Sequence, residues 1–181
     1  MAKWVIALAL VCAAGESCAQ PTPPQISLEY AVKATYLYKL APFVNWPPDT
    51  FTAANTPFRI CVVGEDPFDN FLEKAVTGRS LGTHPFEVRR MEVLAPGAGC
   101  QIVFIGHLHS QSIRQALDAV RGEPVLTVTD STANPDSGSV MQFVMEHGRV
   151  RFDVNTREAE RNHLTISSKL LNLALAVSNE N

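Results

Sequence analysis

Short apolar segments that alternate with helical segments constrain the fold of this chain more than any other feature of its sequence. Residues 58–63, 100–105 and 125–128 are almost continuously apolar, a pattern that is typical of strands buried inside a sheet. Helical patterns lie between these runs, one opening at Asp66-Pro67 and one over residues 110–120. The alternation predicts an open α/β sheet with several parallel strands.

A long helix is expected before the first strand, over residues 27–43. Its apolar residues recur at helical spacing, and they are Leu28, Val32, Tyr36, Leu40 and Phe43. Glu29 and Lys33 are spaced as an ion pair, which we expect on the solvent side of this helix. The helix should end near Trp46, because Pro47 disfavours helical geometry at the preceding residue.

The C-terminal third predicts a hairpin followed by helices. Residues 140–145 and 149–154 have strand patterns and are separated by a turn at His147-Gly148. Asn155 can cap a short helix over residues 156–162, and a leucine-rich helix over residues 169–177 should be buried on most sides. The expected fold is therefore an open, mixed, largely parallel sheet flanked by helices, with a C-terminal antiparallel hairpin and a packed C-terminal helix.

The first residues have the pattern of a secretory signal peptide. Lys3 precedes an apolar run over residues 4–14, and Ser17-Cys18-Ala19 places small residues before an expected cleavage site at Gln20. We therefore expect a signal peptide over residues 1–19, an extended lead-in over 20–26 and a single domain over 27–178. Export predicts a periplasmic location, and the net charge of −3 argues against nucleic-acid binding.

Two cysteines, Cys61 and Cys100, remain after the expected cleavage. An even count in an oxidising compartment favours a disulfide between them. Such a bridge would place their two strands side by side. Two buried free thiols are the alternative.

No arrangement of residues in the sequence indicates catalysis. His107 and His109 follow a strand and could ligate zinc, but no third ligand accompanies them, so ordinary loop histidines are the simpler interpretation. The loop serines lack a nucleophile motif; they are Ser131, Ser137 and Ser139. The acidic residues near residue 66 fit a helix start; they are Asp66, Asp69 and Glu73. We expect no enzyme activity, no metal and no cofactor.

Basic residues near the C-terminus suggest a surface for a protein partner. The residues concerned are Arg149, Arg151, Arg157, Arg161 and His163, all predicted to lie outside apolar, core-facing positions. Arginine is enriched at protein interfaces, although an ordinary solvated face would have the same pattern. Trp46 is a further candidate, either as an anchor for a partner or as a cover over the core.

Several segments resemble the YfiR family in sequence and in order. They are Phe43-Val44-Asn45-Trp46-Pro47, Arg59-Ile60-Cys61-Val62-Val63-Gly64, Ile102-Val103-Phe104-Ile105, Arg151-Phe152-Asp153-Val154-Asn155 and Leu164-Thr165-Ile166-Ser167-Ser168-Lys169. The resemblance covers nearly the whole chain after the expected leader. Cys61 and Cys100 match one disulfide of that family, and a second cysteine pair near the hairpin is absent here.

The resemblance implies a periplasmic, non-catalytic repressor. Proteins of this family bind the periplasmic part of an inner-membrane diguanylate cyclase, which lowers cyclic di-GMP and biofilm formation. An outer-membrane lipoprotein of YfiB type can sequester the repressor, and family members form homodimers. The alternative function is a periplasmic sensor that binds a small ligand near Gly64 and Gly106, at the carboxyl ends of the strands.

Overall fold

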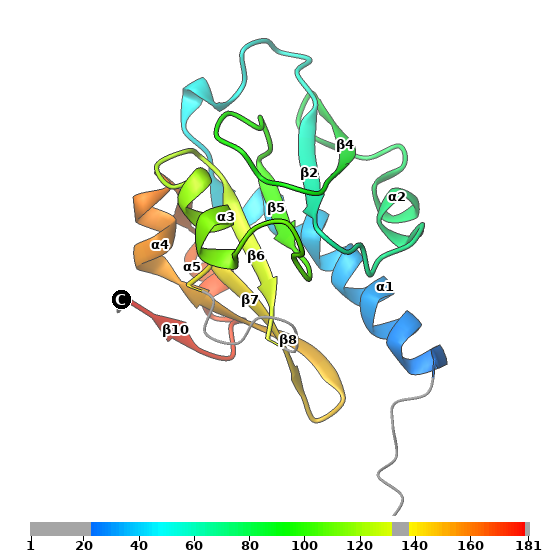
Figure 1. The fold of residues 1–181 in the computed structure, drawn as a ribbon. Coiled ribbons are helices and arrows are strands. Elements are labelled where there is room, and N and C mark those ends of the chain that lie inside the picture. Colours follow the sequence, from blue (N-terminus) through cyan, green and yellow to red (C-terminus); the bar gives the residue numbers. More distant parts are fainter. Residues whose placement is uncertain (1–22, 132–137, 180–181) are drawn as a thin grey trace, which may run out of the picture.

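The computed structural model describes residues 23–131 and 138–179, so the expected signal peptide and Ser137 lie outside the described residues. An eight-stranded sheet has the order β10-β8-β7-β6-β5-β2-β4-β3 (Figure 1). The strands are β2 (Phe58–Val63), β3 (Ser80–Leu81), β4 (His84–Met91), β5 (Ile102–Ile105), β6 (Leu126–Asp130), β7 (Met141–Glu146), β8 (Arg149–Asn155) and β10 (Val177–Ser178). Strands β4, β2, β5, β6 and β7 are mutually parallel, and the β7–β8 hairpin is antiparallel. The expected mixed, largely parallel sheet is confirmed.

Helices cover both faces of the sheet. Helices α1 (Pro23–Leu40) and α2 (Phe71–Val76) share a core with one face, and α3 (Ile113–Ala119) packs on the other, the face nearer the viewer in Figure 1. Helices α4 (Thr156–Arg161) and α5 (Ser168–Leu171) lie beside β8, and short strands β1 (Val44–Asn45) and β9 (Thr165–Ile166) form a second sheet. Two 3-10 turns complete this part: η1 (Ala41–Phe43) and η2 (Pro48–Thr50). Within the described residues, no helix has the length and apolar character needed to cross a membrane.

The disulfide lies on the α3 face of the sheet. Strands β2 and β5 are neighbours in parallel register, with Cys61 opposite Val103. Cys100 precedes β5, and its sulfur is bonded to that of Cys61 across a Cα–Cα distance of 6.0 Å. Both cysteines are buried. The structure therefore agrees with the bridged alternative and with adjacent strands.

The first helix is present but lies earlier than predicted: it begins at Pro23, within the expected extended lead-in, and ends at Leu40, before a 3-10 turn. It also differs from the expectation in which side chains it buries. Leu37 and Leu40 face the core, whereas Leu28 and Val32 are 68% and 37% exposed. Lys33 is fully buried, so the expectation of an ion pair on the solvent side is wrong. The core-facing stripe of α1 runs through Lys33, because a buried carboxylate on β6 neutralises this lysine.

The second helix begins later than predicted. The Asp66 carboxylate accepts a hydrogen bond from the Phe68 backbone N–H (2.7 Å), which forms a turn and not a helix cap. Helix α2 starts only at Phe71, after Asp69 adopts a positive φ of 49°.

The predicted helix over residues 169–177 is also wrong in length. Helix α5 ends at Leu171, and the chain then extends along the open edge of β8. The Leu175 N–H donates to the Phe152 carbonyl oxygen (2.8 Å), and the Val154 N–H donates to the Ala176 carbonyl oxygen (3.0 Å). Pairing with a sheet edge satisfies backbone groups of both segments. As a result the last apolar side chains are exposed: Leu173, Leu175 and Val177.

Candidate partner-binding surfaces

Arg151 lies on the β7–β8 hairpin, apart from the other candidate arginines. Its guanidinium is 3.4 Å from the Glu146 carboxylate on the facing strand and 3.5 Å from the Leu173 carbonyl oxygen. Three residues of extended chain lie between Arg151 and Asn155, the cap of α4, so the two Cα atoms are roughly 13 Å apart at the usual rise of a strand. The expected single patch is therefore divided between two parts of the surface.

Arg157, Arg161 and His163 form the second part, on α4 and directly after it. All three side chains are exposed. The Arg161 guanidinium forms an ion pair with Glu158, one turn earlier in the same helix. The Asn155 side chain caps the helix by accepting a hydrogen bond from the Glu158 N–H (3.1 Å), as the sequence predicted. This surface presents two guanidinium groups and an imidazole to solvent.

The position of His163 follows from how α4 ends. The backbone N–H groups of His163 and Leu164 donate to Glu160 and Ala159, at 2.9 and 2.8 Å, which is the hydrogen-bond pattern of a Schellman motif. His163 occupies the left-handed position of that motif, with φ of 56°, a position that favours glycine. The exposure of the imidazole is thus a consequence of local backbone geometry.

Trp46 packs against the core at the same end of the molecule as His163. The indole Nε1–H donates to the Ala41 carbonyl oxygen (3.1 Å), and the ring lies edge-to-face on Phe58 with centroids 5.2 Å apart. Asn45 pairs with Thr165, so the segments before Trp46 and after His163 are neighbours. These contacts fit a cover over the core, one of the two roles expected for this tryptophan.

A hollow of about 640 Å³ lies beside His163, at the amino ends of β5 and β6. Carboxylates of Asp49 and Glu123 line it, together with Pro47 and the buried Thr50 hydroxyl, which has no hydrogen-bond partner among the described residues. Because the strands are parallel, this edge is opposite to the one where the sensor alternative places a ligand.

Backbone fills the space between β2 and β5 at their carboxyl ends. A Cβ atom added to Gly64 would lie 2.3 Å from the His107 carbonyl oxygen, and one added to Gly106 would lie 2.2 Å from that of Glu65. The His109 Nε2 atom is 2.8 Å from the Glu65 carboxylate, and both side chains are exposed. Among the described residues, no group of three or more His, Cys, Asp or Glu side chains is arranged to hold a metal ion.

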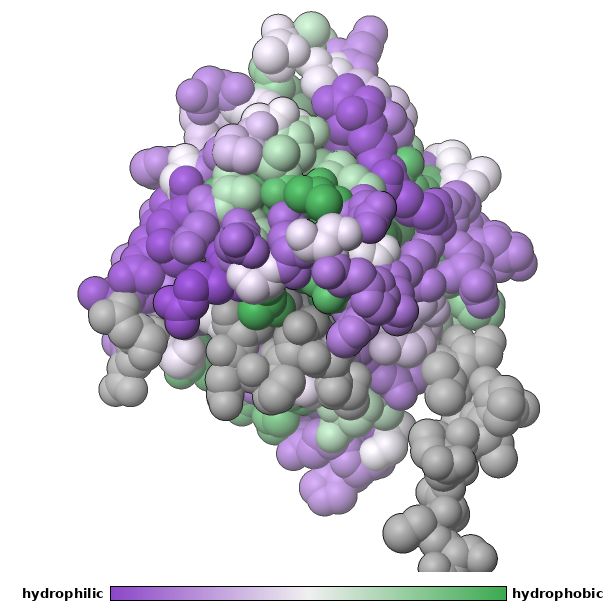
Figure 2. All heavy atoms as spheres, viewed as in Figure 1, coloured by the Kyte–Doolittle hydropathy of each residue, from purple (hydrophilic) through white to green (hydrophobic). Residues whose placement is uncertain are grey.

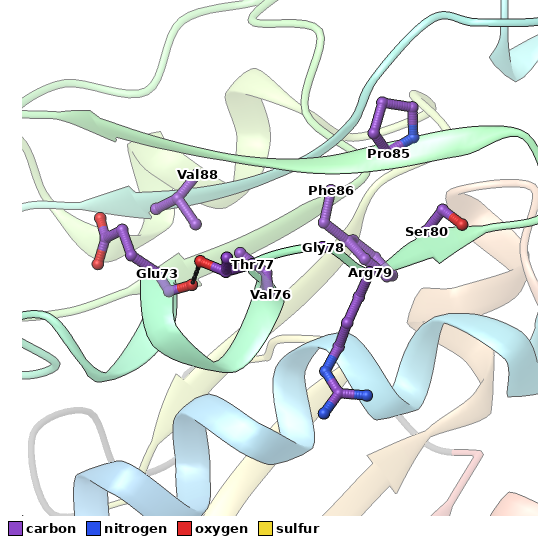
Figure 3. A pocket seen from close by; sticks show the side chains of 9 residues that line it. All are labelled: Glu73, Val76, Thr77, Gly78, Arg79, Ser80, Pro85, Phe86 and Val88. Carbon is purple, nitrogen blue, oxygen red and sulfur yellow. Dashed lines mark hydrogen bonds between the residues drawn. The ribbon is translucent and has the colours of Figure 1, made fainter.

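A second hollow, of about 480 Å³, lies between α2 and β4 (Figure 3). Its charged residues are already engaged. The Glu73 carboxylate accepts a hydrogen bond from the Arg90 guanidinium. This hydrogen bond holds the pKa of Glu73 below its ordinary value and raises the pKa of Arg90. Arg79 turns away from the hollow towards α1 and lies over the Tyr38 ring, 4.9 Å from its centroid. Arg90 also binds Asp66, so these acidic residues act structurally around it.

A buried charged cluster joins α1 to β6. The Lys33 ammonium forms ion pairs with Asp130 at the end of β6 and with Glu29 one turn earlier in α1. The Tyr30 hydroxyl donates to the Asp130 carboxylate (3.2 Å), and the Lys33 ammonium lies 4.6 Å from the Tyr30 ring centroid. The position of α1 on the sheet is therefore fixed by charge as well as by apolar packing.

A groove of about 690 Å³ separates α1 from the β7–β8 hairpin, and we call it the α1–hairpin groove. Its residues are Leu28, Glu29, Val32 and Tyr36 from α1, and Met145, Gly148, Arg149, Val150 and Arg151 from the hairpin. Both walls project at the lower end of Figure 1. By contrast, the α3 side of the molecule is mainly hydrophilic, with small separate apolar areas (Figure 2).

The groove residues other than the arginines are not predicted from the sequence as part of a surface site, since Leu28 and Val32 show only the apolar spacing of a helix. A signal was present: α1 carries apolar residues on more than one side, because Ala34 and Leu37 lie on a different face from Leu28. A helix with two apolar faces can bury only one of them against its own sheet, so the other apolar face remains exposed.

Among the loop serines, Ser139 has a structural role. The Ser139 hydroxyl is buried and is 2.7 Å from both the Thr129 hydroxyl and the Met141 carbonyl oxygen.

Comparison with protein families identifies the chain. A family model described as YfiR/HmsC-like matches residues 30–175, which include the later part of α1 and the elements that follow it as far as α5. On this match over most of its length, the chain belongs to the YfiR/HmsC-like family.

Proposed function

We propose that this protein is a periplasmic repressor that binds the periplasmic part of an inner-membrane diguanylate cyclase and holds the enzyme inactive. Membership of the YfiR/HmsC-like family carries this proposal, since it suggests a non-catalytic periplasmic regulator of diguanylate cyclase signalling. An outer-membrane lipoprotein of YfiB type is the proposed antagonist, which sequesters the repressor and releases the cyclase.

The described surface supports a role in protein binding. The two parts of the arginine surface, Arg151 on the hairpin and Arg157 with Arg161 on α4, lie on rigid elements that are hydrogen-bonded at their ends. Rigid presentation lowers the conformational cost of association. Arginine also forms paired hydrogen bonds with carboxylates of a partner.

Genetic deletion tests the repressor role. Loss of the gene should raise cyclic di-GMP and biofilm mass, and the wild-type gene should restore both to their original values. A variant with Arg157→Glu and Arg161→Glu tests the α4 surface, and Arg114→Glu, an exposed arginine on α3, is the matched control. Unchanged cyclic di-GMP on deletion, with the cyclase expressed, would refute the repressor role. Full repression by the folded double variant would refute only the α4 surface.

A further inference from the structure

We infer that the outer edge of β4 binds an extended, acidic segment of another protein as an added strand, with one apolar side chain of that segment in the hollow beside α2. This binding goes beyond the repressor role and does not depend on it. It is supported by main-chain groups of β4 that have no partner among the described residues, by the apolar hollow next to them, and by nearby cations outside any described ion pair.

The outer edge of β4 has main-chain groups that no neighbouring strand uses. The Gly64 N–H donates to the Met91 carbonyl oxygen (3.0 Å), so the main-chain groups of Met91 point towards β2. These groups alternate in direction along a strand, so those of Val88 and Arg90 point away from β2. On that side the short β3 pairs only with the first residues of β4. Val88 and Arg90 therefore each present an N–H donor and a carbonyl acceptor that have no partner within the described residues.

Helix α2 lies across the hollow of about 480 Å³ from this edge (Figure 3). Val76 and Thr77 at the end of α2 line one side, and Phe86 and Val88 on β4 line the other. A helix beside an edge strand is suited to an extended peptide, because the strand bonds the main chain of the peptide and the adjacent space takes its alternate side chains. The valine and phenylalanine side chains make this space apolar, so it suits an apolar side chain of the bound segment.

The charges at one end of the hollow favour an acidic segment. The carboxylate of Glu73 is already bound by Arg90. Arg79 lies between this hollow and a second one of about 310 Å³, which Lys39 also lines. Both cations are exposed, and neither forms an ion pair within the described part of the chain. A carboxylate on the bound segment would therefore meet an excess of positive charge at this end.

The charged side chains of β4 leave its outer edge available. Such side chains often protect the edge of a sheet from pairing with another chain, but those of β4 are held in other contacts. The Glu87 carboxylate is bound by Arg59 and Arg89, and Arg90 binds two carboxylates of the α2 region. An extended chain is the ligand whose main chain carries donors and acceptors at intervals that match those of β4.

Nuclear magnetic resonance of the isotope-labelled protein tests the inference, with the blocked peptide acetyl-Thr-Val-Thr-Val-Asp-amide as the probe. The amide signals of Val88 and Arg90 should shift on titration. Their exchange with water should slow about fivefold when about four-fifths of the protein is bound, since only the unbound fraction then exchanges. The Met91 amide, which already faces β2, should keep its exchange rate.

Two control peptides separate the contribution of the main chain from that of the side chains. The same peptide with N-methyl groups on its amide nitrogens cannot donate hydrogen bonds to β4 and should not bind measurably. The peptide with lysine in place of aspartate should bind about threefold more weakly, and Arg79→Gln should remove most of that difference.

Two variants at position 88 test the edge itself. Val88→Pro removes one outward N–H at an edge position where proline is tolerated, and it should weaken binding about fivefold or more. Val88→Thr keeps the N–H and the shape of the side chain, and it should bind the peptide nearly as well as the wild type does.

The inference is overturned by an absence of shifts at millimolar peptide, by equal binding of the N-methylated peptide, by unchanged exchange of the Val88 and Arg90 amides in the bound state, or by equal affinity of folded Val88→Pro. A lysine peptide that binds as tightly as the aspartate peptide overturns the acidic preference. If Val88→Pro does not fold, the N-methylated peptide decides the outcome.

Discussion

Arg90 shows how single charged residues organise the surface around α2. Its guanidinium binds the carboxylates of Glu73 and Asp66 and donates to the Asp69 carbonyl oxygen (2.9 Å). The hydrogen bond from Arg90 is the main reason that the pKa of Glu73 is below its ordinary value of 4.5. One arginine thereby ties the irregular segment before α2 to strand β4.

Removing this guanidinium should raise the pKa of Glu73. In Arg90→Gln, we expect the Glu73 pKa to move up towards 4.5 in an NMR titration of the carboxyl group. Because the folded-state pKa is depressed, the stability that Glu73 contributes is present above its unfolded pKa and is lost as the pH falls through its folded pKa. The carboxylate is almost half exposed, so this contribution should stay below about 1 kcal/mol.

The matched control for that titration is Arg89→Gln. Arg89 is the main cause of the lowered pKa of Glu87 and does not contact Glu73. Arg89→Gln should therefore raise the pKa of Glu87 and leave that of Glu73 unchanged. If Arg90→Gln leaves the Glu73 titration where it was, the described ion pair is not formed in solution.

His163 permits a test that separates its backbone role from its side-chain role. Glycine suits its left-handed conformation, so His163→Gly should preserve or slightly raise the free energy of unfolding. His163→Val should lower it by about 1–2 kcal/mol, because a β-branched residue is strained at positive φ. Urea denaturation measures both. Equal stability of the two variants would contradict the Schellman geometry.

Single-residue burial was the part of the fold least predictable from the sequence. Lys33 has the spacing of an exposed ion-pair partner of Glu29, but it is buried and also pairs with Asp130, almost one hundred residues away. Leu28 continues an apolar stripe and is nevertheless exposed. Both outcomes depend on contacts between distant segments, which local spacing does not encode.

The Lys33–Asp130 ion pair is the principal link between elements α1 and β6. Lys33→Met should lower the free energy of unfolding by about 3–5 kcal/mol, because it removes one partner of a buried ion pair. Combining Lys33→Met with Asp130→Asn removes both charges and should recover most of that loss. Chemical denaturation of the two variants and the wild type decides this. A double variant as unstable as the single one would contradict a charge-based link.

The disulfide links β2 to the segment before β5. Cys61→Ala should lower the free energy of unfolding by roughly 2–5 kcal/mol, the usual cost of losing a native bridge. Cys100→Ala should have a similar effect, and the double variant should be no worse than the worse single variant, since all three lose the same bond. Two freely labelled thiols in folded protein from the periplasm would contradict the bridge.

Elements were predictable where a local pattern and the final environment agreed. The hairpin and the Asn155 cap are examples, since their turn and capping chemistry acts over a few residues. The segment after Leu171 is the counterexample. Its leucines favour a helix locally, but the open edge of β8 offers hydrogen-bond partners to an extended chain. Whether this segment forms a helix or an extended strand therefore depends on the arrangement of the whole sheet.

At the scale of the whole molecule, the parallel sheet could be predicted because strands and helices alternate along the chain. The arrangement of residues on the surface could not be predicted in the same way. Arg151 and Arg161 are close in sequence, yet they lie on different parts of the surface because β8 is extended between them and α4. The α1–hairpin groove joins residues that are more than one hundred positions apart. Contacts of that range follow from topology and not from sequence spacing.

The central claim is that the protein represses a membrane diguanylate cyclase from the periplasmic side. The most direct measurement is the rate of cyclic di-GMP synthesis in spheroplasts that lack this gene and express a membrane diguanylate cyclase of the same organism with a periplasmic region. Purified protein added to the outer side should lower that rate in a saturable manner, and heat-denatured protein should not. A rate that stays unchanged at saturating protein, for every such cyclase of the organism, would contradict the account.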